Sequence, residues 1–222
     1  MNENSEDLSD AEPGSWRGES GRYLGPAEND AVTRAFERIR SKEPEVSAVL
    51  RDGETEVPGA RLVGFEYRLK GEERFKEKVA ERLAADLRRN PREAAESVPD
   101  ALRYTYQFSP KDYVRGYAEV TEHLRRRGYE LVQSRNFWAR SEYKGINSRW
   151  RTPDGRLFEV QFHTPESFEA KQLTHAAYEL IRNPRSDSRA VERMDDFQRE
   201  VSAEIPMPDG VLDIPNYRKE GY

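Results

Sequence analysis

The chain has 222 residues, 35% of them hydrophobic and 36% charged, and a formal net charge of −5. This composition predicts one modest core surrounded by polar segments, and the acidic balance argues against a protein that coats nucleic acid over its whole surface. The chain contains no cysteine, which excludes a disulfide framework and a thiolate zinc site and is typical of a reducing compartment. No apolar run reaches the length of a transmembrane helix. We therefore expect a soluble protein with no membrane partner.

The first quarter of the chain divides into a tail and a helical extension. Residues 1–26 are rich in Ser, Glu, Asp, Gly and Pro, which predicts a flexible or extended N-terminal tail. In residues 27–58 apolar side chains recur at helical spacing, with a predicted break near Pro44 and a polar turn at 52–59. We expect this second segment to be a helical extension of the domain that follows.

Residues 59–205 carry the patterns of a mixed domain, and residues 206–222 are a C-terminal tail rich in turn formers. Helices are expected at 70–89, 109–127, 164–182 and 187–203. Strands are expected at 60–67, 100–108, 129–133, 146–151 and 157–162, the last two as a hairpin. This order predicts an α+β (α/β-like) fold in which helices flank a mixed sheet of about five strands.

Three basic residues stand around the predicted start of the 70–89 helix. Arg68 and Lys70 lie where a predicted strand meets the helix, and Lys78 lies about two turns along it. Cations beside the free backbone amides of a helix N-terminus are suited to binding a polyphosphate. A solvated, charged helix surface gives the same pattern, because acidic residues alternate with these cations.

The segment LFEVQFH at 157–163 has two chemically distinct faces. Its phenylalanines and valine alternate onto a face that belongs in the core, whereas Glu159, Gln161 and His163 share the opposite face. An ordinary exposed sheet face is one interpretation. A carboxylate, an amide and an imidazole in one row also indicate a binding site on a concave sheet.

Asp100 stands at the leading edge of the predicted strand 100–108. An aspartate in this position is often only a turn or cap residue. If this strand lies beside the strand of Glu159, however, the two carboxylates can share a cation. Mg²⁺ binds in this way, through one or two carboxylates together with substrate phosphates, and would offset charge in an in-line displacement.

The loop RNFWARSEYKGIN places Tyr143 beside Lys144 and Gly145. An aromatic ring on such a loop can stack on a nucleobase, and glycine lets the backbone approach a ligand closely. Aromatic residues in loops also fill gaps in a core, which is our interpretation of Trp138.

The chain has no GxGxxG, P-loop, nucleophile-elbow or HExxH motif, and its three histidines lack metal-binding spacing. A further candidate feature is a phosphate track on a nucleic-acid-binding module. Its members are Arg125, Arg126, Arg127, Arg135 and Arg140. A solvated helix end explains these arginines equally well.

Four segments, taken in order, resemble the synthetase domain of RelA/SpoT homologues, especially the small toxin-like and phage-associated branch. They are YRLKGEERFKEK, PDALRYTYQF, YKGINSRW and GRLFEVQFHTPESFEAKQLTHAAYE, which span about residues 64–182. The most specific match is FEVQFHT, which fits the family's Glu-x-Gln-x-basic-Thr strand end. The resemblance implies a nucleotidyltransferase-like synthetase fold over 59–205. It also implies an ATP-dependent pyrophosphokinase that moves the β,γ-pyrophosphate of ATP to the 3′-hydroxyl of a purine nucleotide.

The resemblance assigns roles to matching residues. Those that match ATP-binding residues are Arg68, Lys70, Lys78 and Arg103. Asp100 and Glu159 match the carboxylates that hold Mg²⁺, and Glu159 also activates the acceptor hydroxyl. The acceptor side comprises Tyr143, which stacks on the base, with Lys144, Asn147, Gln161 and His163.

The acceptor side departs from the long alarmone synthetases, because Ala139, Ser141 and Asn147 replace their Lys, Asn and His. The acceptor therefore stays open between a guanosine nucleotide, an adenosine nucleotide and a tRNA 3′ end, the first two giving (p)ppGpp-type or (p)ppApp-type alarmones. The toxin branches imply an antitoxin or immunity protein as partner and action in the cytoplasm, with delivery as an effector as one variant. A non-catalytic interaction or virion-associated protein of the same fold is the remaining alternative.

Overall fold

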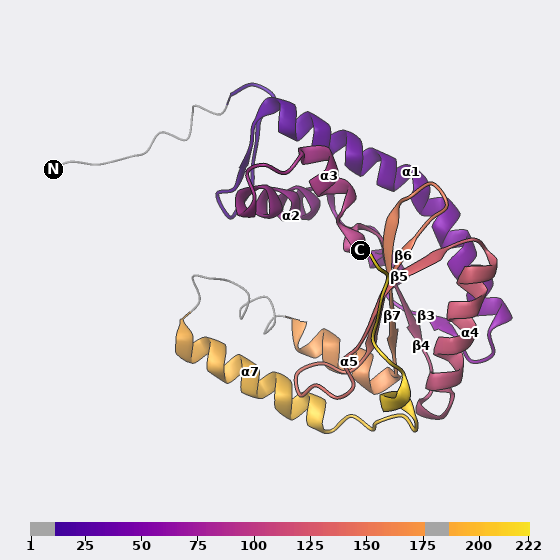
Figure 1. Cartoon of the computed structure of the whole chain (residues 1–222). Helices are drawn as coiled ribbons and strands as arrows, with labels where there is room; N and C mark the ends of the chain where they lie inside the picture. The colour runs from indigo at the N-terminus through magenta and orange to yellow at the C-terminus, as the bar shows by residue number, and fades with distance from the viewer. Residues whose placement is uncertain (1–11, 176–186) are drawn as a thin grey trace.

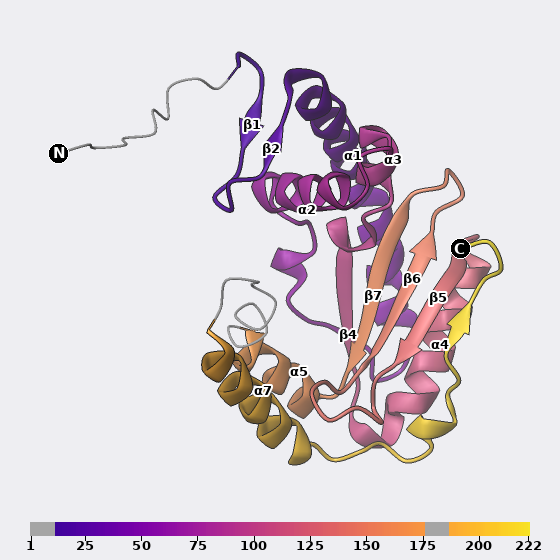
Figure 2. The same ribbon diagram turned by 60° about the vertical axis from the view of Figure 1, so that its left-hand side comes forward.

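The computed structural model describes residues 12–175 and 187–222 and is centred on a six-stranded mixed sheet of order β3-β4-β7-β6-β5-β8 (Figures 1 and 2). The strands are β3 (Arg61–Leu62), β4 (Arg103–Gln107), β5 (Glu130–Asn136), β6 (Ile146–Arg151), β7 (Leu157–His163) and β8 (Tyr217–Arg218). Strands β4 and β7 are parallel, and the other neighbours are antiparallel. The expected α+β fold and the hairpin expected from strands 146–151 and 157–162 are confirmed, and β8 adds a strand from the segment expected as a C-terminal tail.

The described helices are α1 (Pro26–Glu56), α2 (Glu72–Ala85), α3 (Pro91–Glu96), α4 (Tyr113–Arg126), α5 (Pro165–Leu173) and α7 (Ser188–Ala203). Helices α2, α4 and α7 lie within predicted helices and are shorter than expected, whereas α3 lies in a segment expected to be a connection. The end of the predicted 164–182 helix lies outside the described residues from 176 onward. Within the described ranges, no helix combines the length and the apolar composition that crossing a membrane requires.

The predicted break in α1 at Pro44 is wrong, because the helix continues through the proline to Glu56. A proline removes one helical hydrogen bond, but buried side chains on both sides of it keep one continuous face on the core. The predicted turn at 52–59 is mostly helix for a related reason. A Cβ atom on Gly53 would lie 2.5 Å from the Tyr106 hydroxyl, so glycine here permits close helix–sheet packing and does not form a turn.

The register of the strands gives the sheet one polar and one apolar face. Glu159 of β7 lies opposite Arg103 of β4 and Arg149 of β6, and Gln161 lies opposite Asn147 of β6. Because alternate residues of a strand face opposite sides, these polar side chains share one face. This arrangement brings residues from three strands into neighbouring rows.

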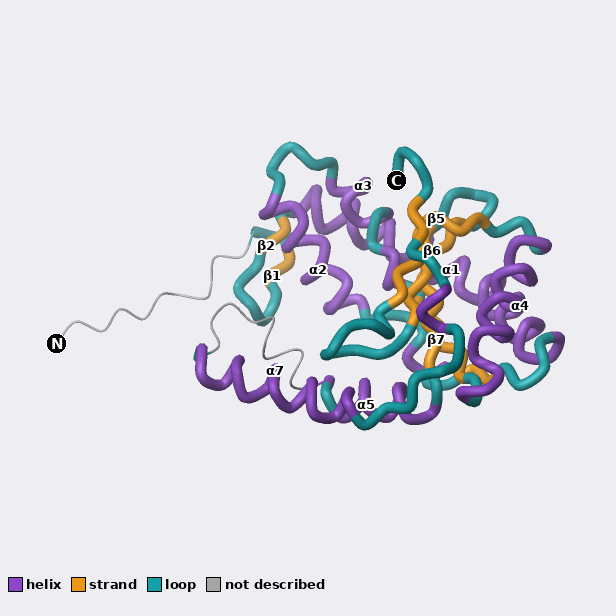
Figure 3. The backbone as a smooth tube through the Cα atoms, turned by 60° about the horizontal axis from the view of Figure 1, so that its bottom comes forward, coloured by secondary structure: helices purple, strands orange, loops and turns teal. Residues whose placement is uncertain are grey.

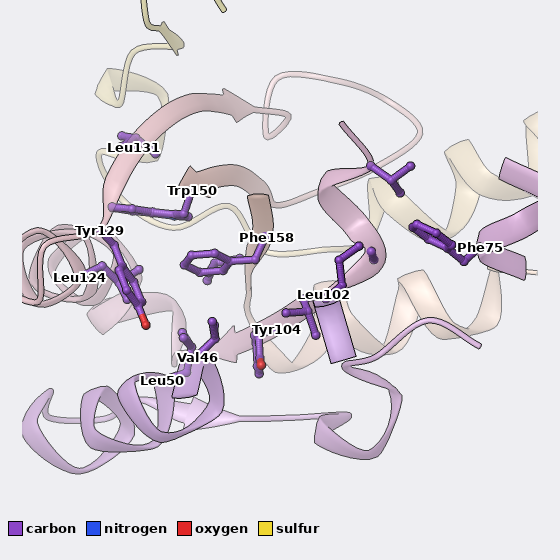
Figure 4. Packing of buried hydrophobic residues seen from close by; sticks show 14 of the residues in the cluster. Val46, Leu50, Phe75, Leu102, Tyr104, Leu124, Tyr129, Leu131, Trp150 and Phe158 are labelled. Carbon is purple, nitrogen blue, oxygen red and sulfur yellow. The ribbon is translucent and has the colours of Figure 1, made fainter. Parts of the chain in front are cut away.

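The apolar face packs against α1 and α4, which cover one side of the sheet (Figure 1). Figure 4 shows Val46 and Leu50 of α1 close to Tyr104 and Phe158 of the sheet. All four side chains are buried, and each contributes about 1.5–3 kcal/mol through removal of apolar surface from water. This core fixes the sheet whose other face is polar.

Part of the segment expected as an N-terminal tail is folded. Strands β1 (Trp16–Arg17) and β2 (Tyr23–Leu24) form a short antiparallel hairpin beside α2 (Figure 2). The indole N–H of Trp16 donates to Glu73 at 2.8 Å, and the Ser20 hydroxyl donates to Glu77 at 2.6 Å. These bonds attach the hairpin to the side of α2.

Candidate active site

A cleft of about 750 Å³ lies over the polar face of the sheet. One wall comes from α2 and the β1–β2 hairpin, and the other comes from α5 and α7. Figure 3 shows these two groups of elements apart from each other. Its lining residues range from Arg22 to Gln198. The volume is typical of a site for a small molecule such as a nucleotide.

The cleft is positively charged within an acidic protein. Of the described residues that line it, eight are lysine or arginine and five are aspartate or glutamate. The cations are Arg22, Lys70, Arg74, Lys78, Arg82, Arg103, Arg149 and Lys171. Since the whole chain has a net charge of −5, the local excess of cations favours a polyanionic ligand.

Asp100 lies in a short 3-10 turn just before β4 and is held by two lysines. The Lys78 ammonium donates to both carboxylate oxygens, at 2.8 and 2.7 Å, and the Lys70 ammonium lies 3.3 Å from Oδ2. Burial alone would raise the pKa of Asp100, but the two ammonium groups lower it to about 2. Asp100 is therefore ionised at neutral pH.

Glu159 lies on the floor of the same cleft. Its backbone N–H donates to Leu102 at 2.9 Å, and its side-chain Oε1 accepts a hydrogen bond of 2.8 Å from Gln161. Burial raises the pKa of Glu159, while the positive charge of Arg103 opposes that shift and the negative charge of Asp100 adds to it. A carboxylate with a raised pKa beside a second, ionised carboxylate is typical of an acid–base site.

The donor set of the cleft suits Mg²⁺. Among the described residues, no group of three or more His, Asp and Glu comes together in an arrangement for a metal ion. Asp100 and Glu159 supply two carboxylates on one cleft, and Mg²⁺ needs no more from a protein when phosphates and water complete its octahedron. The residues present therefore fit Mg²⁺ bound together with a phosphorylated ligand.

Tyr143 and Asn147 also line the cleft. The Tyr143 hydroxyl donates to the Asn147 side chain at 2.8 Å, and its ring packs edge-on against Phe137 with centroids 5.5 Å apart. Burial, together with the negative charge of Glu159, raises the pKa of Tyr143 well above its ordinary value. Its ring is therefore a neutral, fixed surface suited to stacking.

His163 supports Tyr143 from behind and does not line the cleft. Its Nε2 lies 2.9 Å from the Tyr143 hydroxyl and its Nδ1 lies 2.9 Å from the Ser167 hydroxyl. Burial lowers the pKa of His163 well below its ordinary value, so the ring is neutral. We assign the proton to Nε2, because the Tyr143 hydroxyl already donates to Asn147 and Ser167 can donate to Nδ1.

Two further residues expected in the site also lie off the cleft. Arg68 donates to the Glu43 carboxylate and to the Phe65 carbonyl, the latter at 3.0 Å. Lys144 donates to the Trp138 carbonyl at 2.9 Å and so closes its own loop. Neither residue is among those that line the cleft. Their expected roles in ligand binding stay predictions.

Sequence reasoning missed several cations of the cleft, and for some of them a signal was present. Arg74 and Arg82, which were missed, continue the four-residue interval of Lys70 and Lys78, the spacing of one helix face. Arg149 lies two residues after Asn147 on one strand, which places both on one face. For Lys171 no signal existed, because it depends on how α5 packs on the sheet.

The expected phosphate track lies away from the cleft. None of its arginines is among the described residues that line the cleft. Arg127 forms ion pairs with Asp52 and Glu56 of α1, both at 2.7 Å. This pairing explains Arg127 as a contact between α4 and α1.

No protein-family model and no curated protein sequence matches the chain. Solved structures with the same architecture include a type VI effector and a small alarmone synthetase. The type VI effector Tas1, solved in complex with its immunity protein, has a TM-score of 0.52 and 19% identity over 83% of this chain and 98% of that one. Small alarmone synthetase 1 from Bacillus subtilis has a TM-score of 0.51 and 16% identity over 79% of this chain and 94% of that one. At these identities the likeness shows the fold.

Proposed function

We propose that the protein is an ATP-dependent pyrophosphokinase that transfers the β,γ-pyrophosphate of ATP to the 3′-hydroxyl of a purine nucleotide. The observation that carries the proposal is the meeting of Asp100 and Glu159 on one cationic cleft, although they are far apart in the chain. The fold shared with a small alarmone synthetase supports it.

In the proposed reaction the acceptor 3′-oxygen attacks the β-phosphorus of ATP. The bond from that phosphorus to the oxygen bridging the α- and β-phosphates breaks, and AMP leaves with this oxygen. Glu159 takes the proton of the 3′-hydroxyl, for which its raised pKa is suited. A bound Mg²⁺ would neutralise phosphate charge. Phosphoryl transfer of this kind depends on positioning and electrostatics more than on covalent chemistry by the protein.

Different cations of the cleft would contact different parts of the two substrates. Lys70 and Lys78, with Arg74 on the next turn of α2, line the wall where the triphosphate of ATP would lie. Arg103 lies beside Glu159 in the β4–β7 ladder, between this wall and the acceptor side. Tyr143 would stack on the acceptor base, and Asn147 and Gln161 line the same cleft, where the acceptor would lie against them.

The test is incubation of the purified protein with ATP labelled on the β-phosphate, Mg²⁺, and one acceptor at a time from GDP, GTP, ADP, AMP and uncharged tRNA. The proposal predicts AMP together with label on the acceptor. Formation of ADP without labelled acceptor would point to an ordinary phosphatase or kinase, and no conversion with any acceptor would contradict the proposal.

The fold shared with an effector solved with its immunity protein supports a second part of the proposal. We infer that the protein acts on the nucleotide pool of a cytoplasm as a toxin and is neutralised by a dedicated protein partner. Expression in a bacterial host is expected to arrest growth, and the Glu159→Gln variant is expected to relieve the arrest. Equal arrest by both proteins would separate toxicity from pyrophosphate transfer.

A further inference from the structure

Lys171 of α5 reaches the floor of the cleft and is linked to Glu159 through Gln161. Its ammonium donates to Gln161 Oε1 at 2.5 Å, and Gln161 Nε2 donates to Glu159 Oε1 at 2.8 Å. The three side chains thus form a chain of two hydrogen bonds with a cation at one end and a carboxylate at the other.

The position of Lys171 is costly for a residue with no function. Burial lowers its pKa to about 8, the charge of Arg103 adds to that shift, and Glu159 opposes it. Within the described residues its ammonium forms no ion pair; its hydrogen bond is to a neutral amide, and it lies 5.4 Å from the centroid of the Phe168 ring. A partly buried charge of this kind costs folding free energy that a methionine at the same place would not.

The chemistry of the three groups admits one orientation of the amide. An ammonium has only donors and an ionised carboxylate has only acceptors. The Gln161 carbonyl must therefore face Lys171, and its NH₂ group must face Glu159. The reversed amide would place NH₂ against the ammonium and carbonyl oxygen against the carboxylate, two repulsive contacts in a site with little water.

We propose that Lys171 is a positioning residue, which orients Gln161 and through it fixes Glu159 so that Oε2 is presented to the ligand. The catalytic role of Glu159 in this inference rests on the proposed function. Arg103 and Arg149 flank Glu159 on the neighbouring strands. Neither forms a hydrogen bond with Glu159 in the described part of the chain, so Gln161 holds the carboxylate and Lys171 holds Gln161.

The test is a double-mutant cycle of Lys171→Met, Gln161→Met and the double variant, with pyrophosphate transfer as the first readout. Lys171→Met is expected to lower kcat by about 10–100-fold, the usual effect of losing an outer partner of a catalytic group, with little change in the KM for ATP. The double variant is expected to be no slower than Gln161→Met alone. Lys171→Arg keeps a donor and is expected to restore most of kcat.

Lys76→Met is the matched control, because Lys76 is a buried lysine outside the cleft and pairs with Glu72 at 2.8 Å. It is expected to leave kcat unchanged. Wild-type kcat in Lys171→Met would overturn the proposal. So would a double variant whose loss equals the product of the two single losses, since that result means that the side chains act independently.

The Tm of the same variants gives a readout that does not need transfer. A linked pair predicts that the second substitution changes Tm much less than the first, whereas additive changes in Tm would overturn the link. If the wild-type protein shows no transfer with any acceptor, the proposed function fails by itself, and the Tm cycle still decides whether Lys171 orients Gln161.

Discussion

The Lys78 ammonium donates to both carboxylate oxygens of Asp100, at 2.8 and 2.7 Å, and both side chains line the cleft. Lys70 approaches the same carboxylate at 3.3 Å. The candidate metal ligand is therefore paired with two of the candidate phosphate ligands. Lys70 and Lys78 would bind phosphate oxygens of ATP, and Asp100 would hold Mg²⁺.

The first prediction concerns stability and pH. The pKa of Asp100 is about 2 in the folded protein and about 3.9 in an unfolded chain, so acid favours unfolding. The carboxylate contributes roughly 2 kcal/mol of stability above about pH 4, and this is lost as the pH falls toward 2. Urea unfolding of Asp100→Asn should show a free energy of unfolding about 2 kcal/mol lower than wild type at pH 7. The two proteins should converge in acid, and a pH-independent difference would contradict this origin.

The second prediction concerns the two carboxylates in catalysis. Asp100→Asn and Glu159→Gln are each expected to reduce transfer by roughly a thousandfold or more, because each removes a carboxylate that would hold Mg²⁺ against the reacting phosphates, and Glu159→Gln also removes the proposed base. Circular dichroism is expected to show that both variants keep the fold. Asp112→Asn is the control, since Asp112 lies off the cleft and pairs with Arg115. Full activity in either cleft variant would contradict the proposed metal site.

The strands that form the floor of the site could be predicted from the sequence, and the reason is local. Residues 158–163 alternate strictly between apolar and polar, and a turn of Thr-Pro-Asp-Gly fixes the hairpin before them. The alternation places Glu159 and Gln161 on one face whatever the rest of the chain does. The parallel pairing of β4 with β7 brings Asp100 to the same edge of the sheet as Glu159. The sequence alone did not establish this pairing.

The destinations of Arg68 and Lys171 could not be predicted, because each depends on packing between distant elements. Arg68 is two residues from Lys70, but its guanidinium lies over the Phe65 ring, 4.3 Å from the centroid, and pairs with Glu43 of α1. Lys171 faces the cleft only because α5 packs on β7. The unbroken course of α1 through Pro44 has the same cause, since tertiary packing outweighs a local helix-breaking signal.

The third prediction separates stacking of the Tyr143 ring on the acceptor base from the hydrogen bonds of its hydroxyl. Tyr143→Ala removes the stacking surface and is expected to raise the KM of the acceptor by about tenfold or more, with a smaller effect on ATP, since base stacking is worth about 1–3 kcal/mol. Tyr143→Phe keeps the ring but loses the hydrogen bonds to Asn147 and His163, so its effect should be milder. Steady-state kinetics with each substrate varied in turn measures both. Equal losses for ATP and acceptor would count against stacking on the acceptor.

The fourth prediction compares two cations that the sequence grouped together. Lys78 lines the cleft whereas Arg68 does not, so Lys78→Ala should weaken ATP binding by about tenfold or more. Arg68→Ala is expected to lower the free energy of unfolding by about 1 kcal/mol, through loss of its ion pair and its contact with Phe65, and to weaken ATP binding less. Calorimetric titration with ATP and urea unfolding measure the two effects. A larger loss of affinity in Arg68→Ala would show that Arg68 leaves Glu43 to bind the nucleotide.

The most direct measurement is the identity of the adenine product when the wild-type protein and Glu159→Gln are incubated with ATP, Mg²⁺ and the acceptor panel. Pyrophosphate transfer predicts AMP in equal amount to pyrophosphorylated acceptor with the wild type, and neither product with the variant. Release of ADP in place of AMP, or the same AMP yield from both proteins, would contradict the assignment of this cleft to pyrophosphate transfer.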